Sequence, residues 1–166
     1  IHARWQHIPG AAEEVIPNVH PRARTDGYPT GAVGQAGYHQ ADTACPISAD
    51  TWSSAYWSAQ TSVAAADAVL GGAQTAYALC RPPGHHAYAD QAGGFCFLNN
   101  SAIAAQRLLE AGRKPVMLDI YLPHGNSPQG VSYERGVVLT IFIPADPTAF
   151  YPFFWGYPEE IGAGAG

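Results

Sequence analysis

Two adjacent histidines, His85 and His86, lie in a turn-rich stretch that reads RPPGHHAYADQAGGFCFLNN. An imidazole titrates near neutral pH, so each can act as a general base and as a general acid. Such a histidine needs a hydrogen-bond acceptor on its other ring nitrogen to fix its orientation. Asp119 and Asn126, at the end of a later apolar segment and just after it, are candidates for these two acceptors. The pattern therefore indicates acid–base chemistry on a bound substrate.

The same stretch holds candidates for substrate contact. Gly93 and Gly94 have no side chains, so the backbone there can approach a ligand closely. Phe95 is a candidate wall for a narrow channel, and packing in the core is the alternative that its residue type leaves open. Cys96 is predicted to lie in the core, because free cysteine is among the most buried residue types.

Helices and strands on both sides of this stretch must position these residues. The sequence predicts helices over residues 50–70 and 99–112, and strands over residues 75–80, 115–120 and 137–143. One face of the first helix repeats at helical spacing and is predicted to face the core: Trp52, Tyr56, Ala59 and Val63. The order of elements is typical of a parallel α/β sheet, and near-continuous apolar strands fit a sheet that is covered on both faces.

The loops after the first two strands are predicted to bring the chemical residues together. Residues 81–98 and 121–136 leave the carboxyl ends of these strands, and open α/β sheets bind their ligands at that edge. The histidine pair leaves one strand there, and Asp119 and His124 leave the other.

The composition excludes several classes of function. With 47% hydrophobic and 13% charged residues, the 166-residue chain is typical of a compact domain with a buried core. Its basic residues are scattered and its net charge is −5, which argues against nucleic acid as a partner. No apolar run approaches the ~18 residues of a membrane span, and no signal peptide is visible. Three cysteines without CxxC spacing indicate reduced thiols in a cytoplasmic protein.

The chain changes character at about residue 47. Residues 1–47 are rich in proline, glycine and turn formers, whereas residues 48–166 carry the predicted α/β elements. The first residue is not methionine and the chain ends on the glycine run GAGAG. We therefore expect residues 1–166 to form a single, partial domain.

Several segments together resemble the histone deacetylase superfamily, and in particular its bacterial acetylpolyamine amidohydrolases. They read RPPGHHA, GGFCFLNN, AIAAQRLLEAG, YERGVVLT, ADPTAFYPFFWGY and GAGAG, and the resemblance covers nearly the whole chain. It implies the three-layer arginase/deacetylase-like α/β fold with a central, mostly parallel sheet, of which part is present. It also implies a zinc-dependent amide hydrolase that removes acetyl groups from acetylated polyamines or related acetylamines by means of metal-activated water.

The resemblance assigns roles to the acid–base residues. His86 matches the general base and His85 its electrostatic partner. Asp119 matches the carboxylate that orients His85 and also touches a monovalent cation such as K⁺. Asn126 matches the partner of His86.

The resemblance also assigns the substrate contacts and the entrance. Gly94 matches the glycine whose carbonyl receives the substrate amide N–H, and Phe95 matches a tunnel aromatic. Residues 1–47 resemble an insertion near the entrance, which shapes a homodimer and narrows the way in for slender cationic substrates.

The sequence departs from the family at the zinc-ligand positions. The family runs Asp-Ile-Asp-x-His-His-Gly, and alternate residues of an extended run point the same way, so its second Asp and first His face one ion. This chain reads DIYLPHG, which places Tyr121 and Pro123 at those two positions. Neither can serve as a zinc ligand, because proline has no donor atom and neutral tyrosine is a poor one. His124 aligns with the second, non-ligating histidine and is expected to point away.

Three explanations for this departure stay open. The chain is a metal-free, non-catalytic relative that keeps the pocket; or it is a fragment, with the third zinc ligand and the catalytic tyrosine beyond Gly166; or residues 121–128 and 144 are misidentified. Ser127, Pro128 and Pro144 also differ from the family pattern. The last two explanations together agree best with the orderly flanking sequence.

Overall fold

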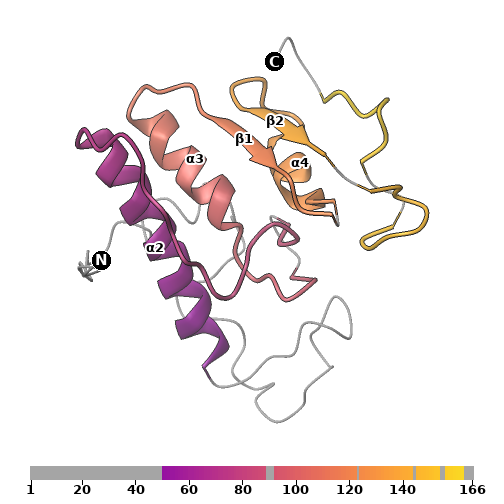
Figure 1. Cartoon of the computed structure of the whole chain (residues 1–166), viewed down its shortest axis with the longest axis horizontal. Coiled ribbons are helices and arrows are strands. Elements are labelled where there is room, and N and C mark those ends of the chain that lie inside the picture. Colours follow the sequence, from indigo (N-terminus) through magenta and orange to yellow (C-terminus); the bar gives the residue numbers. More distant parts are fainter. Residues whose placement is uncertain (1–49, 89–91, 123, 144, 154–155, 163–166) are drawn as a thin grey trace.

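The computed structural model describes residues 50–88, 92–122, 124–143, 145–153 and 156–162 (Figure 1). In chain order it contains the helices and strands α2 (Thr51–Leu70), α3 (Asn100–Glu110), β1 (Val116–Asp119), α4 (Asn126–Ser132) and β2 (Leu139–Phe142). The loop-rich segment predicted over residues 1–47 lies outside the described residues, as do Pro123 and Pro144.

The core forms where α2 and α3 pack side by side (Figure 1). Ala59, Val63 and Ile103 are fully buried there, and alanines along both helices let the two backbones approach closely. Trp52 and Tyr56 pack against the same cluster, so the predicted core face of the first helix is confirmed. Asn99 caps α3 by accepting a hydrogen bond from the backbone N–H of Ala102.

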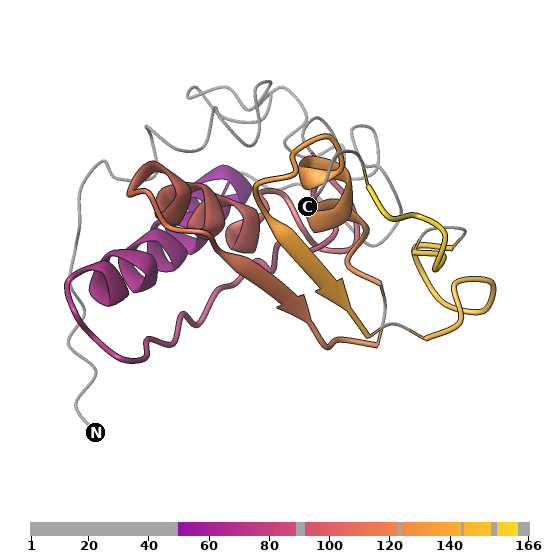
Figure 2. The ribbon, with the colours of Figure 1, turned by 90° about the horizontal axis from the view of Figure 1, so that it is seen from above.

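The two strands pair in parallel, as the sequence predicts. Val116 lies opposite Leu139, and Leu118 lies opposite Ile141. α3 contacts β1 and α4 contacts β2, and both helices lie on the same side of the strands (Figure 2). Met117 points to that side and packs against the core. The four residues of the two strand pairs point to the other side, and all of them are exposed: Val116, Leu118, Leu139 and Ile141. The described helices therefore cover one face of the sheet.

The strand predicted over residues 75–80 is wrong. These residues are extended without a strand assignment, and Tyr77 and Leu79 are 87% and 76% exposed. A strand exists through its backbone partners, and within the described residues β1 and β2 pair only with each other. The apolar run is real, but no described neighbour pairs with it.

Helix α4 was missed, because its residues were assigned to a long loop. The sequence NSPQGVS has no apolar repeat, and the structure shows a short helix that places Pro128 in its first turn, where proline is tolerated. Within the described parts of the chain, no helix is both long and apolar enough to cross a membrane.

Candidate active site

The first histidine pairs with the carboxylate at the end of β1. His85 Nδ1 lies 2.9 Å from Asp119 Oδ2, and Asp119 Oδ1 accepts the backbone N–H of Tyr121 at 3.1 Å. Burial alone would raise the pKa of Asp119, but the hydrogen bonds from His85 and Tyr121 outweigh it and lower this pKa. An ionised Asp119 only accepts, so it holds the proton of His85 on Nδ1.

The second histidine pairs with the first residue of α4. His86 Nδ1 lies 2.8 Å from Asn126 Oδ1, and the two side chains belong to residues that are 6% and 7% exposed. With the amide oxygen as acceptor, Nδ1 carries the proton and Nε2 is left as the basic nitrogen. The rings of His85 and His86 lie 4.0 Å apart, so a charge on one acts directly on the other.

Backbone contacts hold the two loops together at this point. The backbone N–H of Ser127 donates to the carbonyl of His85 at 3.2 Å, and its hydroxyl donates to the carbonyl of Ala87. Gly125 lies so close to Asp119 that an added Cβ would meet Oδ2 at 2.1 Å. The start of α4 is thus fixed against both histidines.

Glycine is required beside His86. Gly94 has a φ of +52°, and an added Cβ would lie 2.3 Å from the His86 ring and 3.0 Å from the Tyr151 ring. Phe95 follows with a φ of +64° and is 60% exposed, so it does not pack in the core. Cys96, in contrast, is fully buried as predicted.

Tyr151 is a site residue that the sequence reasoning did not single out. Its ring stands edge-on to His86 with the centroids 4.7 Å apart, and Phe153 continues the row at 6.3 Å from Tyr151. The signal was the aromatic run AFYPFFWGY, which marks a cluster but not which ring meets His86.

The described residues do not fit a zinc ion. Tyr121 is 63% exposed, and its ring stands edge-on to His85 with the centroids 5.4 Å apart. Pro123, at the second ligand position, lies outside the described residues, and its side chain has no donor atom. Within the described ranges, no three His, Cys, Asp or Glu side chains gather as a metal site.

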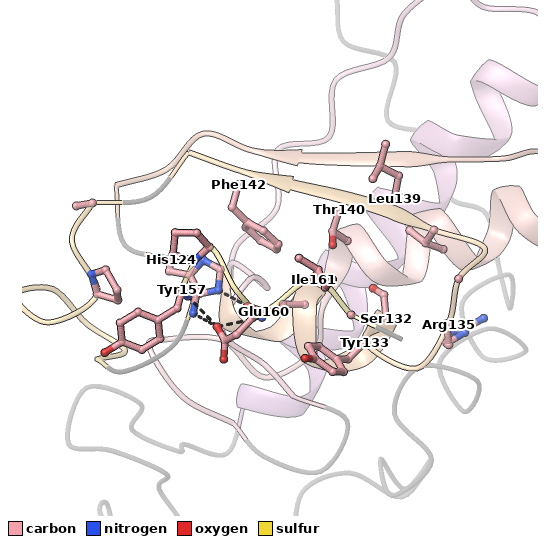
Figure 3. A pocket seen from close by; sticks show the side chains of 18 of the residues that line it. His124, Ser132, Tyr133, Arg135, Leu139, Thr140, Phe142, Tyr157, Glu160 and Ile161 are labelled. Atoms are coloured by element: carbon pink, nitrogen blue, oxygen red, sulfur yellow. Dashed lines mark hydrogen bonds between the residues drawn. The ribbon is translucent and has the colours of Figure 1, made fainter. Parts of the chain in front are cut away.

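His124 does not join the histidine pair. It is buried, its Nε2 lies 2.6 Å from Gln129 Oε1, and its ring stands edge-on to Phe142 at 4.5 Å. This direction agrees with the alternation expected along the segment. A cavity of about 580 Å³ lies beside His124, between α4, β2 and residues 156–162 (Figure 3). His85, His86 and Asp119 do not line it.

Comparison with known proteins identifies the class. The family model for the histone deacetylase domain matches residues 10–166. The chain therefore belongs to the histone deacetylase family. Within it, the chain is 47% identical over 167 residues to the acetylpolyamine amidohydrolase of Burkholderia pseudomallei (strain 1710b), covering 100% of this chain and 48% of that protein. The acetylpolyamine amidohydrolase of Mycoplana ramosa is 42% identical over 164 residues, with 98% of this chain and 48% of that protein covered.

Solved structures agree with the fold. The crystal structure of acetylpolyamine aminohydrolase from Burkholderia pseudomallei superposes with a TM-score of 0.73 at 50% identity, covering 88% of this chain and 42% of that one. A histone deacetylase homologue from Aquifex aeolicus gives 0.70 at 27% identity, covering 92% and 40%. The predicted deacetylase-like α/β fold, present in part, is confirmed. The chain spans about half the length of the curated relatives it matches.

Proposed function

We propose that the protein hydrolyses acetylated amines, with acetylpolyamines as its substrate class. The pairing of His85 with Asp119 and of His86 with Asn126 carries the proposal, since it supplies two oriented imidazoles 4.0 Å apart. The similarity to acetylpolyamine amidohydrolases over the whole chain supports the substrate class.

Each histidine has a separate task in this proposal. His86, with Nε2 as its basic nitrogen, accepts the proton of the attacking water and returns it to the leaving amine. His85, held beside the Asp119 carboxylate, balances the charge that develops on His86. The His85 side chain is 20% exposed, so water screens its interaction with His86 only in part.

The substrate contacts follow from the loop around Gly94. The slender amine chain of the substrate is proposed to lie against the exposed ring of Phe95, and the carbonyl of Gly94 is the acceptor proposed for the substrate amide N–H. Tyr151 supplies a second wall, because its ring meets His86 directly. The net charge of −5 favours cationic amines over anionic ones.

The proposal includes the metal ions and the homodimer that the family resemblance implies, but it gives zinc no role in hydrolysis. The family resemblance calls for zinc and a monovalent cation, with Asp119 as a ligand of the latter. Because Tyr121 and Pro123 do not fit zinc, no step of hydrolysis is assigned to it. The proposal also includes a homodimer, an entrance insertion in residues 1–47 and a cytoplasmic location. The location is supported by Cys80 and Cys96, which form no disulfide bond.

The second candidate is a binding protein that keeps the acetylamine pocket without hydrolysis. Tyr121 favours it, because an aromatic ring stands beside His85 where the family pattern has a carboxylate. In this case the histidine pair orients the bound amide but no water is activated.

One experiment separates the two. Purified protein is given acetylputrescine and acetylspermidine with and without a chelator, and its zinc content is measured by elemental analysis. Turnover supports the hydrolase, and the chelator arm with the zinc content then shows whether that turnover needs a metal. Binding of acetylputrescine without turnover or zinc supports the binding protein. Absence of both binding and turnover rejects both.

A further inference from the structure

Glu160 gathers three N–H groups on one carboxylate oxygen. Its Oε2 accepts the backbone N–H of Gly156 at 2.6 Å, that of Tyr157 at 2.8 Å and the side-chain amide of Gln129 at 3.3 Å (Figure 3). Hydrogen bonds to a charged acceptor are stronger than neutral ones. Glu160 therefore ties residues 156–157 to α4.

The first connection between Glu160 and the surroundings of His86 runs through helix α4. Gln129 is on this helix, and its Oε1 accepts the Nε2 proton of His124. Asn126, the partner of His86, opens the same helix three residues earlier, and residues at this spacing lie on one face. Holding Gln129 therefore limits the movement of Asn126.

The second connection runs through residues 156–157, which follow Tyr151 in the chain. Gly156 and Tyr157 come shortly after Tyr151, whose ring stands 4.7 Å from His86. Gly156 also packs so tightly on the His124 ring that an added Cβ would approach it to 2.7 Å. The helix that begins with Asn126 and the segment that follows Tyr151 in the chain are thus hydrogen-bonded to one carboxylate.

We propose that Glu160 is a positioning residue that sets the placement of His86 by fixing Asn126 through α4 and Tyr151 through residues 156–157. None of the side chains predicted for the site bonds to Glu160 in the described structure, so Glu160 acts through these two partners. The inference rests on the proposed function only for the role of His86; the tie itself is independent of it.

Tyr88 gives a separate indication that Glu160 acts near Asn126. Burial raises the pKa of the Tyr88 hydroxyl to about 12, the nearby Asn126 side chain opposes the rise, and the charge of Glu160 adds to it. The Tyr88 ring lies against Gly130, one helical turn beyond Asn126. The carboxylate is therefore close enough to act on groups that surround Asn126.

The tie is tested by amide exchange followed by mass spectrometry. In Glu160→Ala, exchange at residues 156–157 and in α4 is expected to speed up by about tenfold or more. Glu160→Gln keeps an acceptor oxygen and should restore most of the protection. Glu159→Ala, at the exposed neighbouring position, is the matched control and should leave exchange unchanged. Unchanged exchange in Glu160→Ala overturns the tie.

The positioning role is tested by the affinity for acetylputrescine, measured by calorimetry, and by kcat and KM where turnover is present. Glu160→Ala is expected to weaken binding by about tenfold at a temperature where the variant is folded, with Glu160→Gln close to wild type. Faster exchange without any change in affinity or kcat overturns positioning and leaves a purely structural tie. Wild-type binding without turnover rejects the hydrolase but still tests Glu160, whereas absence of wild-type binding overturns the positioning role too.

Discussion

The Asp119 carboxylate meets His85 Nδ1 at 2.9 Å, at the point where β1 ends and the backbone turns away. One carboxylate oxygen orients the imidazole, and the other accepts the backbone N–H of Tyr121, so the same group fixes a side chain and the start of a loop. Two opposed effects meet here: burial favours the neutral acid and the hydrogen bonds favour the carboxylate, and the hydrogen bonds prevail.

This pair predicts a pH dependence of stability. The pKa of Asp119 is lower in the folded protein than its ordinary value of 3.8, so the folded state favours the ionised form. The stabilisation is complete above the ordinary value and is lost as the pH falls through the lower, folded value. Asp119→Asn should cost about 1 kcal/mol at pH 7, a figure that allows for solvent screening of a side chain that is 18% exposed.

The measurement is the free energy of unfolding by urea at several pH values. The gap between wild type and Asp119→Asn should be present at pH 5 and should narrow as the pH falls below 3.8. A gap that stays the same down to pH 2 would contradict the ionised pair.

A substitution at Gly94 is predicted to disturb the position of the His86 ring. In Gly94→Ala the new methyl group meets the His86 ring at 2.3 Å, so the ring or the loop must move. We expect a loss of about 1–3 kcal/mol in stability and at least about tenfold in binding of acetylated amines. Gly112→Ala is the matched control: its φ is also positive, at +74°, but nothing lies within 4 Å of its added Cβ. Equal losses of binding in both variants would assign the effect to backbone strain alone.

The two histidine pairs, His85 with Asp119 and His86 with Asn126, could be predicted because the positions of these residues follow from local sequence. Asp119 ends an apolar strand, and the histidine pair follows an apolar run that ends in Pro-Pro-Gly, so both were expected at one edge of the sheet. The meeting of His85 with Asp119 does not depend on the exact limits of the elements. The two residues are hydrogen-bonded in the structure although residues 75–80 do not form the predicted strand.

The remaining contacts could not be predicted, because they depend on tertiary placement. Residues 75–80 have the composition of a strand, but composition does not supply the neighbour that a strand must bond. Tyr151 is one of several aromatics in its run, and only the fold decides which ring meets His86. Glu160 reads as an exposed acid in the motif PEEIG, yet three N–H groups converge on it.

Tyr121 and Pro123 predict a change in metal binding. Replacing both, as Tyr121→Asp with Pro123→His, places a carboxylate and an imidazole at alternate positions of one segment, where they can face a single ion. We expect zinc affinity, measured by competition with a coloured chelator, to rise by about tenfold or more for each ligand restored. Tyr121→Phe, which supplies no ligand, is the control. Wild-type affinity equal to that of the double variant would show that zinc is held by other residues.

The exposed face of the sheet predicts self-association. Leu118 and Ile141 are paired across β1 and β2, are 59% and 42% exposed, and extend an apolar surface through Val116 and Leu139. Parallel strands are ordinarily covered on both faces, and large exposed apolar patches associate. The chain should therefore form concentration-dependent oligomers in sedimentation experiments, and Leu118→Lys with Ile141→Lys should shift it towards the monomer. Val69→Lys, at the exposed end of α2, adds one positive charge away from this face, compared with two in the double variant, and should have no such effect. If Val69→Lys disperses the oligomers equally well, net charge rather than the sheet face governs association.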